Sequence, residues 1–155
     1  MLYGEDIYVG YRYYDAVELA VRFPFGHGLS FTTFRLDSLR VTCQDDKLSV
    51  SLRLQNTGSR AGAEVVQVYV AQQRRSIARP PKELKGFLKQ FLQPSQTVDV
   101  TIDISTKYAT SYWDDSVRKW TSDAGTYTMM VGNSSQGEFL TGSFETDSTF
   151  FWSGI

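Results

Sequence analysis

The sequence predicts an all-β antiparallel sandwich that is preceded by an irregular N-terminal arm. Two observations carry the prediction. After residue 33 the chain consists mostly of short segments in which apolar and polar residues alternate, and clusters of turn residues separate them. This alternation is typical of strands with one buried and one wet face. Seven such strands over about 110 residues, with no sustained helical period, favour a sandwich.

The predicted strands follow one another with turn residues between them. The alternation is cleanest in residues 48–55 and 98–104, where every second residue is Leu, Val or Ile. In residues 63–72 both faces carry apolar residues, so we expect both faces of that strand to be partly covered. The expected strands cover residues 34–43, 48–55, 63–72, 83–92, 98–104, 125–133 and 138–145.

Two local features interrupt this pattern. The first strand changes register near Ser38 and Leu39, which predicts a β-bulge. Residues 105–110 predict one short helical turn with Ser105 or Thr106 as its cap, because hydroxyl side chains are favoured at that position.

Residues 1–33 do not fit the strand pattern and are unusually aromatic. They hold five of the nine tyrosines, and residues 23–34 hold four phenylalanines with one proline and two glycines. Gly and Pro make a regular helix or strand improbable there. Large apolar patches on soluble domains mark interaction surfaces, so we expect this arm to lie against another body of protein. The expected interface residues are Tyr8, Tyr11, Arg12, Tyr13, Tyr14, Phe23, Phe25 and His27.

Composition and motifs argue against several classes of function. The net charge of −1 without long charge runs disfavours nucleic-acid binding and a polybasic membrane patch. No apolar run reaches 18 residues, so no membrane span is expected. His27 is the sole histidine and Cys43 the sole cysteine, which leaves no catalytic triad, metal site or cofactor site to predict. We expect His27 to pack in a turn and Cys43 to be a small buried side chain.

Two further motifs have alternative interpretations. Trp113 and Trp120 flank a short polar segment, which predicts a hairpin with one tryptophan on each arm. These rings, with Tyr112, fit cross-strand core partners, an interdomain contact or a platform for stacking sugars. Residues 133–135 form an Asn-Ser-Ser triplet, so Asn133 is a candidate glycosylation acceptor.

Several stretches together resemble the C-terminal end of glycoside hydrolase family 3 β-glucosidases. The matching motifs include GYRYYD at 10–15 and FPFGHGLSFTTF at 23–34, and their order and spacing agree along nearly the whole chain. Residues 107–114 and 150–155 resemble the fungal members of that family. The remaining matching stretches are residues 56–58, 62–70, 82–87 and 125–132.

The resemblance implies an immunoglobulin-like, fibronectin type III-like sandwich over residues 34–155, with residues 1–33 as the linker from an upstream α/β domain. In such enzymes a barrel domain supplies an aspartate nucleophile and the next domain a glutamate acid/base, and hydrolysis retains configuration. Neither carboxylate's motif occurs in this chain. The resemblance therefore implies an accessory domain that supports the catalytic domains and is inactive alone, with β-glucosides reached only through those domains.

Two other functions stay open at this point. The chain fits a carbohydrate-binding module that uses Trp113 and Trp120, and it fits a stand-alone adhesion or scaffold sandwich. Localisation is also left open, with secretion favoured for the parent enzyme.

Overall fold

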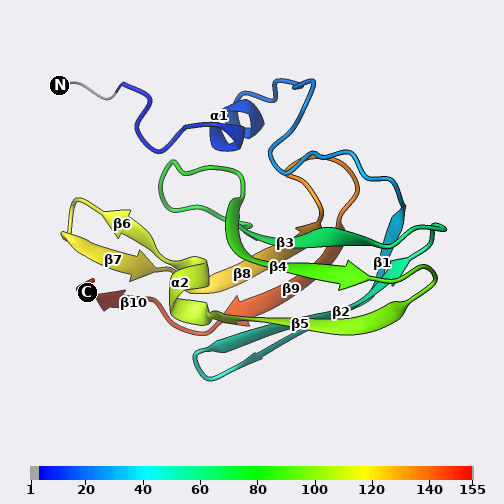
Figure 1. Ribbon diagram of the computed structural model, residues 1–155. Coiled ribbons are helices and arrows are strands. Elements are labelled where there is room, and N and C mark those ends of the chain that lie inside the picture. Colours follow the sequence, from blue (N-terminus) through cyan, green and yellow to red (C-terminus); the bar gives the residue numbers. More distant parts are fainter. Residues whose placement is uncertain (1–3, 155) are drawn as a thin grey trace.

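The computed structural model describes residues 4–154, and its regular structure is almost entirely antiparallel strand (Figure 1). The predicted all-β class is confirmed. The two short helices are α1 (Tyr11–Ala16) and α2 (Thr106–Thr110). The strands are β1 (Phe34–Gln44), β2 (Lys47–Asn56), β3 (Gly62–Gln72), β4 (Glu83–Leu92), β5 (Thr97–Ser105), β6 (Tyr112–Asp114), β7 (Lys119–Ser122), β8 (Gly125–Gly132), β9 (Leu140–Thr146) and β10 (Phe150–Trp152).

Two sheets form the sandwich, and a small third sheet lies at one end of it (Figure 1). The strand order is β1-β2-β5 in one sheet and β4-β3-β8-β9 in the other. Strands β6, β7 and β10 make the third sheet, in the order β10-β7-β6. None of the helices in residues 4–154 is long and apolar enough to cross a membrane.

The core lies between the two main sheets and is built from the predicted alternation. On β2 every second residue from Leu48 to Leu54 is buried, and β5 buries Val100, Ile102 and Ile104 against them. The four-stranded sheet supplies the other half of the core. Its buried residues include Val66, Val68, Val70, Leu92, Tyr127, Met129, Val131 and Phe144.

Strand β3 is buried on both faces, as its sequence predicts. Its valines belong to the core, while Gln67 and Tyr69 point to the other side of the sheet and are buried as well. The arm crosses this outer face (Figure 1). The Tyr69 ring meets Tyr11 of the arm at 5.7 Å between centroids and Phe139 at 6.0 Å. The arm therefore completes a second, outer layer of packing on β3.

The predicted bulge in β1 is confirmed, and the predicted cap of the short helix needs correction. The β1–β2 register shifts between Asp37 and Arg40, and Ser38 has a φ of 59°. Ser105 occupies the N-cap position of α2 but makes no capping hydrogen bond with its side chain. Instead the carboxylate of Asp46, from the β1–β2 turn, accepts hydrogen bonds from the Lys107 N–H at 2.9 Å and from the Ser105 hydroxyl at 2.8 Å.

The prediction that Cys43 is buried is wrong. Cys43 lies near the end of the edge strand β1, where the chain runs out to the exposed β1–β2 turn, and its side chain is exposed. Its sulfur contacts the Thr106 hydroxyl at 3.7 Å. A strand's alternation continues past the end of the core, so a residue can point inward and still reach solvent.

Candidate interdomain interface

Helix α1 places one face of the arm on the sandwich. The backbone N–H of Leu84 donates to the Tyr11 hydroxyl at 2.8 Å. The carboxylate of Asp15 pairs with the ammonium of Lys82, and both side chains are almost fully buried. An ion pair that is withdrawn from water in this way holds its partners firmly, because separating them would leave a buried charge uncompensated. These contacts anchor the arm to the start of β4.

Glu83 is the centre of an ionic cluster beside α1. Its carboxylate lies 3.1 Å from Arg79 Nη2, 3.1 Å from Lys85 Nζ and 3.6 Å from Arg12 Nη2. Burial by itself raises the pKa of Glu83, but the three cations outweigh it and hold that pKa below the ordinary value of 4.5. Burial lowers the pKa of Lys85, and Glu83 opposes that shift. The cluster joins the arm, the β3–β4 connection and β4.

The opposite face of the arm is exposed and apolar. Of the seventeen large hydrophobic side chains that are exposed within residues 4–154, ten lie in the arm. The arm is about a fifth of the chain, so this share is far above proportion. The ten are Ile7, Val9, Tyr13, Tyr14, Val17, Leu19, Phe23, Phe25, Leu29 and Phe31.

A tight turn over residues 23–28 projects part of this apolar face. The N–H of His27 donates to the Pro24 carbonyl at 2.9 Å, and Gly26 has a φ of 84°. The His27 ring packs against Phe23, with 5.3 Å between centroids. The Phe25 ring lies 5.4 Å from Tyr11 and so links the turn to α1.

The structure divides the predicted interface residues between these two faces. Three of them are half-buried against the chain itself: Tyr8, Tyr11 and Arg12. The other five are exposed to solvent: Tyr13, Tyr14, Phe23, Phe25 and His27. Six exposed apolar side chains of the arm and two of β4 were absent from the prediction. They are Ile7, Val9, Val17, Leu19, Leu29, Phe31, Phe87 and Phe91.

The second aromatic group lies in the third sheet. Trp113 and Trp120 pair directly across β6 and β7, as the hairpin prediction requires. The Trp120 ring stacks on Trp152 with 5.4 Å between centroids and 16° between planes, and Lys107 Nζ lies 3.9 Å from the centre of the Trp152 ring. The indole N–H of Trp152 donates to the Ser111 hydroxyl at 2.9 Å. Trp113 meets Trp120 edge-on, with 76° between planes, and its own ring is exposed.

Tyr112 is directed away from the tryptophans. Its ring lies under the guanidinium of Arg79 at 4.9 Å, and its hydroxyl hydrogen-bonds with Ser76 and Asp123. The three residues predicted as sugar-stacking candidates thus do not form one platform. A neighbouring hollow of about 270 Å³ is lined by Lys85, Tyr108, Ser111, Trp120, Trp152 and Gly154.

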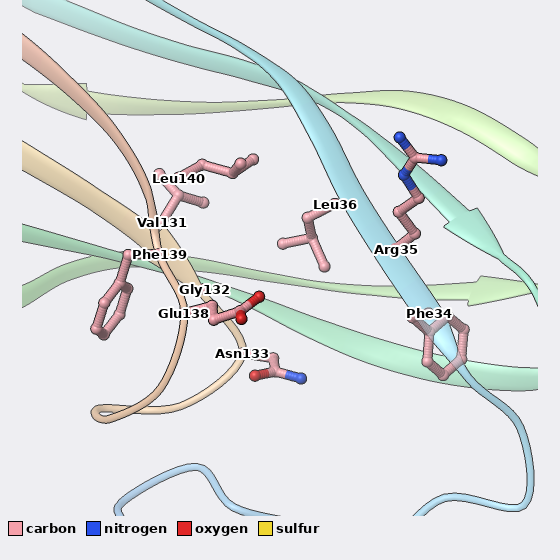
Figure 2. Close-up of a pocket in the computed structure, with 9 residues that line it drawn as sticks. All are labelled: Phe34, Arg35, Leu36, Val131, Gly132, Asn133, Glu138, Phe139 and Leu140. Carbon is pink, nitrogen blue, oxygen red and sulfur yellow. The ribbon is translucent and has the colours of Figure 1, made fainter.

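A separate hollow of about 330 Å³ lies between the start of β1 and the β8–β9 loop (Figure 2). Figure 2 shows Glu138 beside Asn133, with Arg35 directed away from both. A retaining glycosidase needs two carboxyl groups about 5–5.5 Å apart. Glu138 is the one carboxylate among the nine residues that line this hollow. Among the described residues no cluster of three His, Cys, Asp or Glu side chains could hold a metal ion.

Comparison with known proteins accounts for this architecture. The fibronectin type III-like domain family matches residues 64–135. A putative β-glucosidase of Schizosaccharomyces pombe is 47% identical over 154 residues, which are 99% of this chain and 18% of that protein. The crystal structure of a β-glucosidase from Kluyveromyces marxianus superposes with a TM-score of 0.95 and 44% identity over 100% of this chain and 19% of that one.

Residues 64–135 form a fibronectin type III-like domain, and the whole chain is similar to one segment of family 3 β-glucosidases. A third match, the GH3 β-glucosidase of Bifidobacterium adolescentis, has a TM-score of 0.88 and 40% identity, and covers 94% of this chain and 22% of that one. The chain thus spans about a fifth of the length of the relatives it matches. It corresponds to an accessory part of those proteins.

Proposed function

We propose that this domain supports the catalytic domains of a β-glucosidase and contacts them through the exposed face of its arm. The observation that carries the proposal is the division of the arm into two faces. One face is fixed to the sandwich by Tyr11, Asp15 and the Glu83 cluster, while the other presents ten large apolar side chains to solvent. A surface of that kind on a soluble domain is expected to be covered by a partner.

The matched relatives support the same partner. Each has about four fifths of its length outside the matched segment, and their names describe β-glucosidases. We propose that the reaction of the parent protein is hydrolysis of terminal β-glucosyl groups. The carboxylates for it would lie in the other domains.

A graft tests this function. The matched segment of the Kluyveromyces marxianus β-glucosidase is replaced by this chain, and hydrolysis of an aryl β-glucoside and the Tm are measured. We expect an active, folded graft and no hydrolysis by the isolated chain. An inactive graft, or turnover by the purified chain itself, would contradict the proposal.

The arm is then varied within that graft. Phe23→Ser and Phe31→Ser should lower the Tm of the graft and leave that of the isolated chain nearly unchanged, because both rings are exposed in the chain alone. Thr101→Ala, on the exposed side of β5 in the other sheet, is the matched control and should change neither.

Asn133 remains a proposed glycosylation acceptor. Its side chain is exposed, yet its amide donates to Glu64 at 3.3 Å, and the hydroxyl of Ser135 is buried without a hydrogen-bond partner within residues 4–154. We therefore expect a glycan to be added before this loop folds and not afterwards. Peptide mass spectrometry of the chain secreted from yeast, beside the Ser135→Ala variant that destroys the triplet, tests the site.

A further inference from the structure

Strand β4 carries an apolar stripe on the outer side of the four-stranded sheet. A Cβ on Gly86 would meet the side chains of Ile102 and Ile104, so Gly86 faces the core. Alternate residues of a strand point to opposite faces, which turns Phe87, Lys89 and Phe91 outward. Phe87 is 68% exposed and Phe91 56% exposed. Two phenylalanine rings therefore flank one lysine on a face that no part of the described chain covers.

The stripe adjoins the arm. Phe87 pairs with Gln67 of β3, the residue that Gly26 of the arm approaches most closely. At the other end Phe91 pairs with Ala63, next to Gly62, where an added Cβ would meet the side chains of Thr32, Phe34 and Ser30. Between them, a hollow of about 250 Å³ is lined by arm residues 26–30, β3 residues 63–65, Lys89, Asn133 and Ser134.

The arm segment that borders the stripe is itself unusually exposed. Leu29 is 96% exposed and Phe31 93%, values close to those of a side chain with no packing at all. Figure 1 shows the arm running over β3 towards β1 on the same side of the sandwich. Leu29 and Lys89 line the hollow. Phe87 and Phe91 flank Lys89 on β4, and Phe31 follows Leu29 by two residues, so these four apolar side chains form a margin beside the hollow.

The positive charge of Lys89 beside this margin indicates which charge a partner surface needs. Lys89 makes no ion pair with any residue of 4–154, whereas the nearby Glu64 carboxylate is engaged by the Val65 N–H at 2.8 Å and by the Asn133 amide. Covering the two phenylalanines would also withdraw the Lys89 ammonium from water. A buried ammonium is tolerated only beside an opposite charge, so the covering surface needs a carboxylate at that point.

We propose that the outer stripe of β4, with Leu29 and Phe31, is a docking surface for another domain of a longer β-glucosidase, which presents apolar side chains and one carboxylate opposite Lys89. This inference rests on the proposed function and extends it from the arm to the sheet. The four fifths of each relative that lie outside the matched segment are the source of that domain.

The same graft tests the stripe. Phe87→Asp and Phe91→Asp should each lower the Tm of the graft by several degrees, with a smaller change in the isolated chain, where both rings already face water. Thr101→Asp, on the outer side of the other sheet, is the control and should shift the graft no more than the isolated chain. Lys89→Glu should lower the Tm of the graft more than Lys89→Met, because only the first places two carboxylates together.

The outcomes separate the two proposals. An inactive wild-type graft would count against the accessory function and, with it, the stripe. An active graft whose Tm is unmoved by Phe87→Asp, Phe91→Asp and Lys89→Glu would overturn the stripe alone. Sedimentation of the isolated chain completes the test. If the chain forms a dimer and Phe87→Asp dissociates it, the stripe binds a second copy of the chain, and the proposal is overturned.

Discussion

Gly26 lies where the arm passes closest to the sheet. A Cβ there would come within 2.1 Å of the Gln67 side-chain nitrogen, and the φ of 84° disfavours any other residue. Gln67 has little room to move, because it accepts a hydrogen bond from the Tyr69 hydroxyl and donates one to the Asn133 carbonyl at 2.9 Å. The close approach of arm and sheet therefore requires glycine at this position.

We predict that Gly26→Ala destabilises the chain by about 1–3 kcal/mol, the usual cost of overfilling a packed site. Urea denaturation followed by tryptophan fluorescence measures the change. Gly10→Ala is the matched control, since Gly10 also has a positive φ, 56°, and nothing lies within 4 Å of the added methyl group. Equal losses for both variants would show that the backbone conformation, and not the contact with Gln67, limits the site.

Glu83 makes stability depend on pH in the acid range. Its pKa is depressed in the folded chain, so the unfolded chain binds a proton more readily, and the free energy of unfolding rises with pH there. This stabilisation is complete above the ordinary value of 4.5 and is lost as the pH falls through the lower, folded value.

We predict that Glu83→Gln lowers the free energy of unfolding at pH 7 by roughly 3 kcal/mol, because Arg12, Arg79 and Lys85 lose their shared anion. The variant should also show a shallower loss of stability between pH 5 and pH 3 than the wild type (about the range in which carboxylates titrate). Glu138→Gln, at an exposed carboxylate, should leave both quantities close to wild type. Parallel pH curves for Glu83→Gln and the wild type would contradict the assignment.

At the scale of elements, the short helix α2 depends on a residue sixty positions earlier in the chain. At the start of α2, one carboxylate oxygen of Asp46 accepts a hydrogen bond from the Lys107 N–H, and the other accepts one from the Ser105 hydroxyl. A cap that comes from another turn ties the β1–β2 hairpin to the end of β5.

We predict that Asp46→Ala costs about 1 kcal/mol, the typical value of an N-cap, and that Ser105→Ala costs less. Thermal unfolding of the two variants decides between the caps. A larger loss of stability in Ser105→Ala than in Asp46→Ala would show that the Ser105 hydroxyl is the main cap of α2.

The strands could be predicted because each carries its own pattern. The alternation in β2 and β5 and the two-sided burial of β3 are visible in a single segment of sequence. Strand β4 was harder, since Phe87 and Phe91 face outward while Leu88 and Leu92 face the core, and apolar residues on both sides hide the alternation. Apolar residues on both faces of β4 are what the proposed docking surface requires, because that surface lies on the face opposite the core.

Features that depend on distant partners could not be predicted. The six residues of α1 are too few to show a helical period, so Tyr11 and Tyr13 look alike in sequence although one faces the sandwich and the other solvent. The stacking of Trp120 on Trp152 joins residues more than thirty positions apart through the pairing of β7 and β10. For the same reason the sequence suggested a sugar platform that the geometry divides.

At the scale of the whole molecule, the arm and the sandwich form one packed unit. The division of the chain into a linker over residues 1–33 and a domain from residue 34 follows the sequence pattern and remains a prediction. The contacts of Tyr11 with Tyr69 and of Asp15 with Lys82 cross that boundary. The domain family matches residues 64–135, which include most of β3, the strand that the arm covers.

We predict that a chain lacking residues 1–33 is destabilised by at least about 3 kcal/mol, because Lys82 loses its buried carboxylate and the outer face of β3 is uncovered. It should also bind a hydrophobic dye more strongly than the full chain. Removal of residues 1–9, which leaves α1 in place, serves as the control and should cost little. A shortened chain as stable as the original would show that the arm is a true linker.

The order in which the ribosome makes this polypeptide gives the arm a further consequence. Strand β3, the surface on which the arm settles, is completed only at residue 72. At about 5–20 residues per second, the tyrosines and phenylalanines between residues 8 and 31 wait roughly 2–13 s for it. In a polypeptide that carries the proposed catalytic domains upstream, those domains would be made before β3, so the order of synthesis would favour their contact with the arm before the sandwich closes.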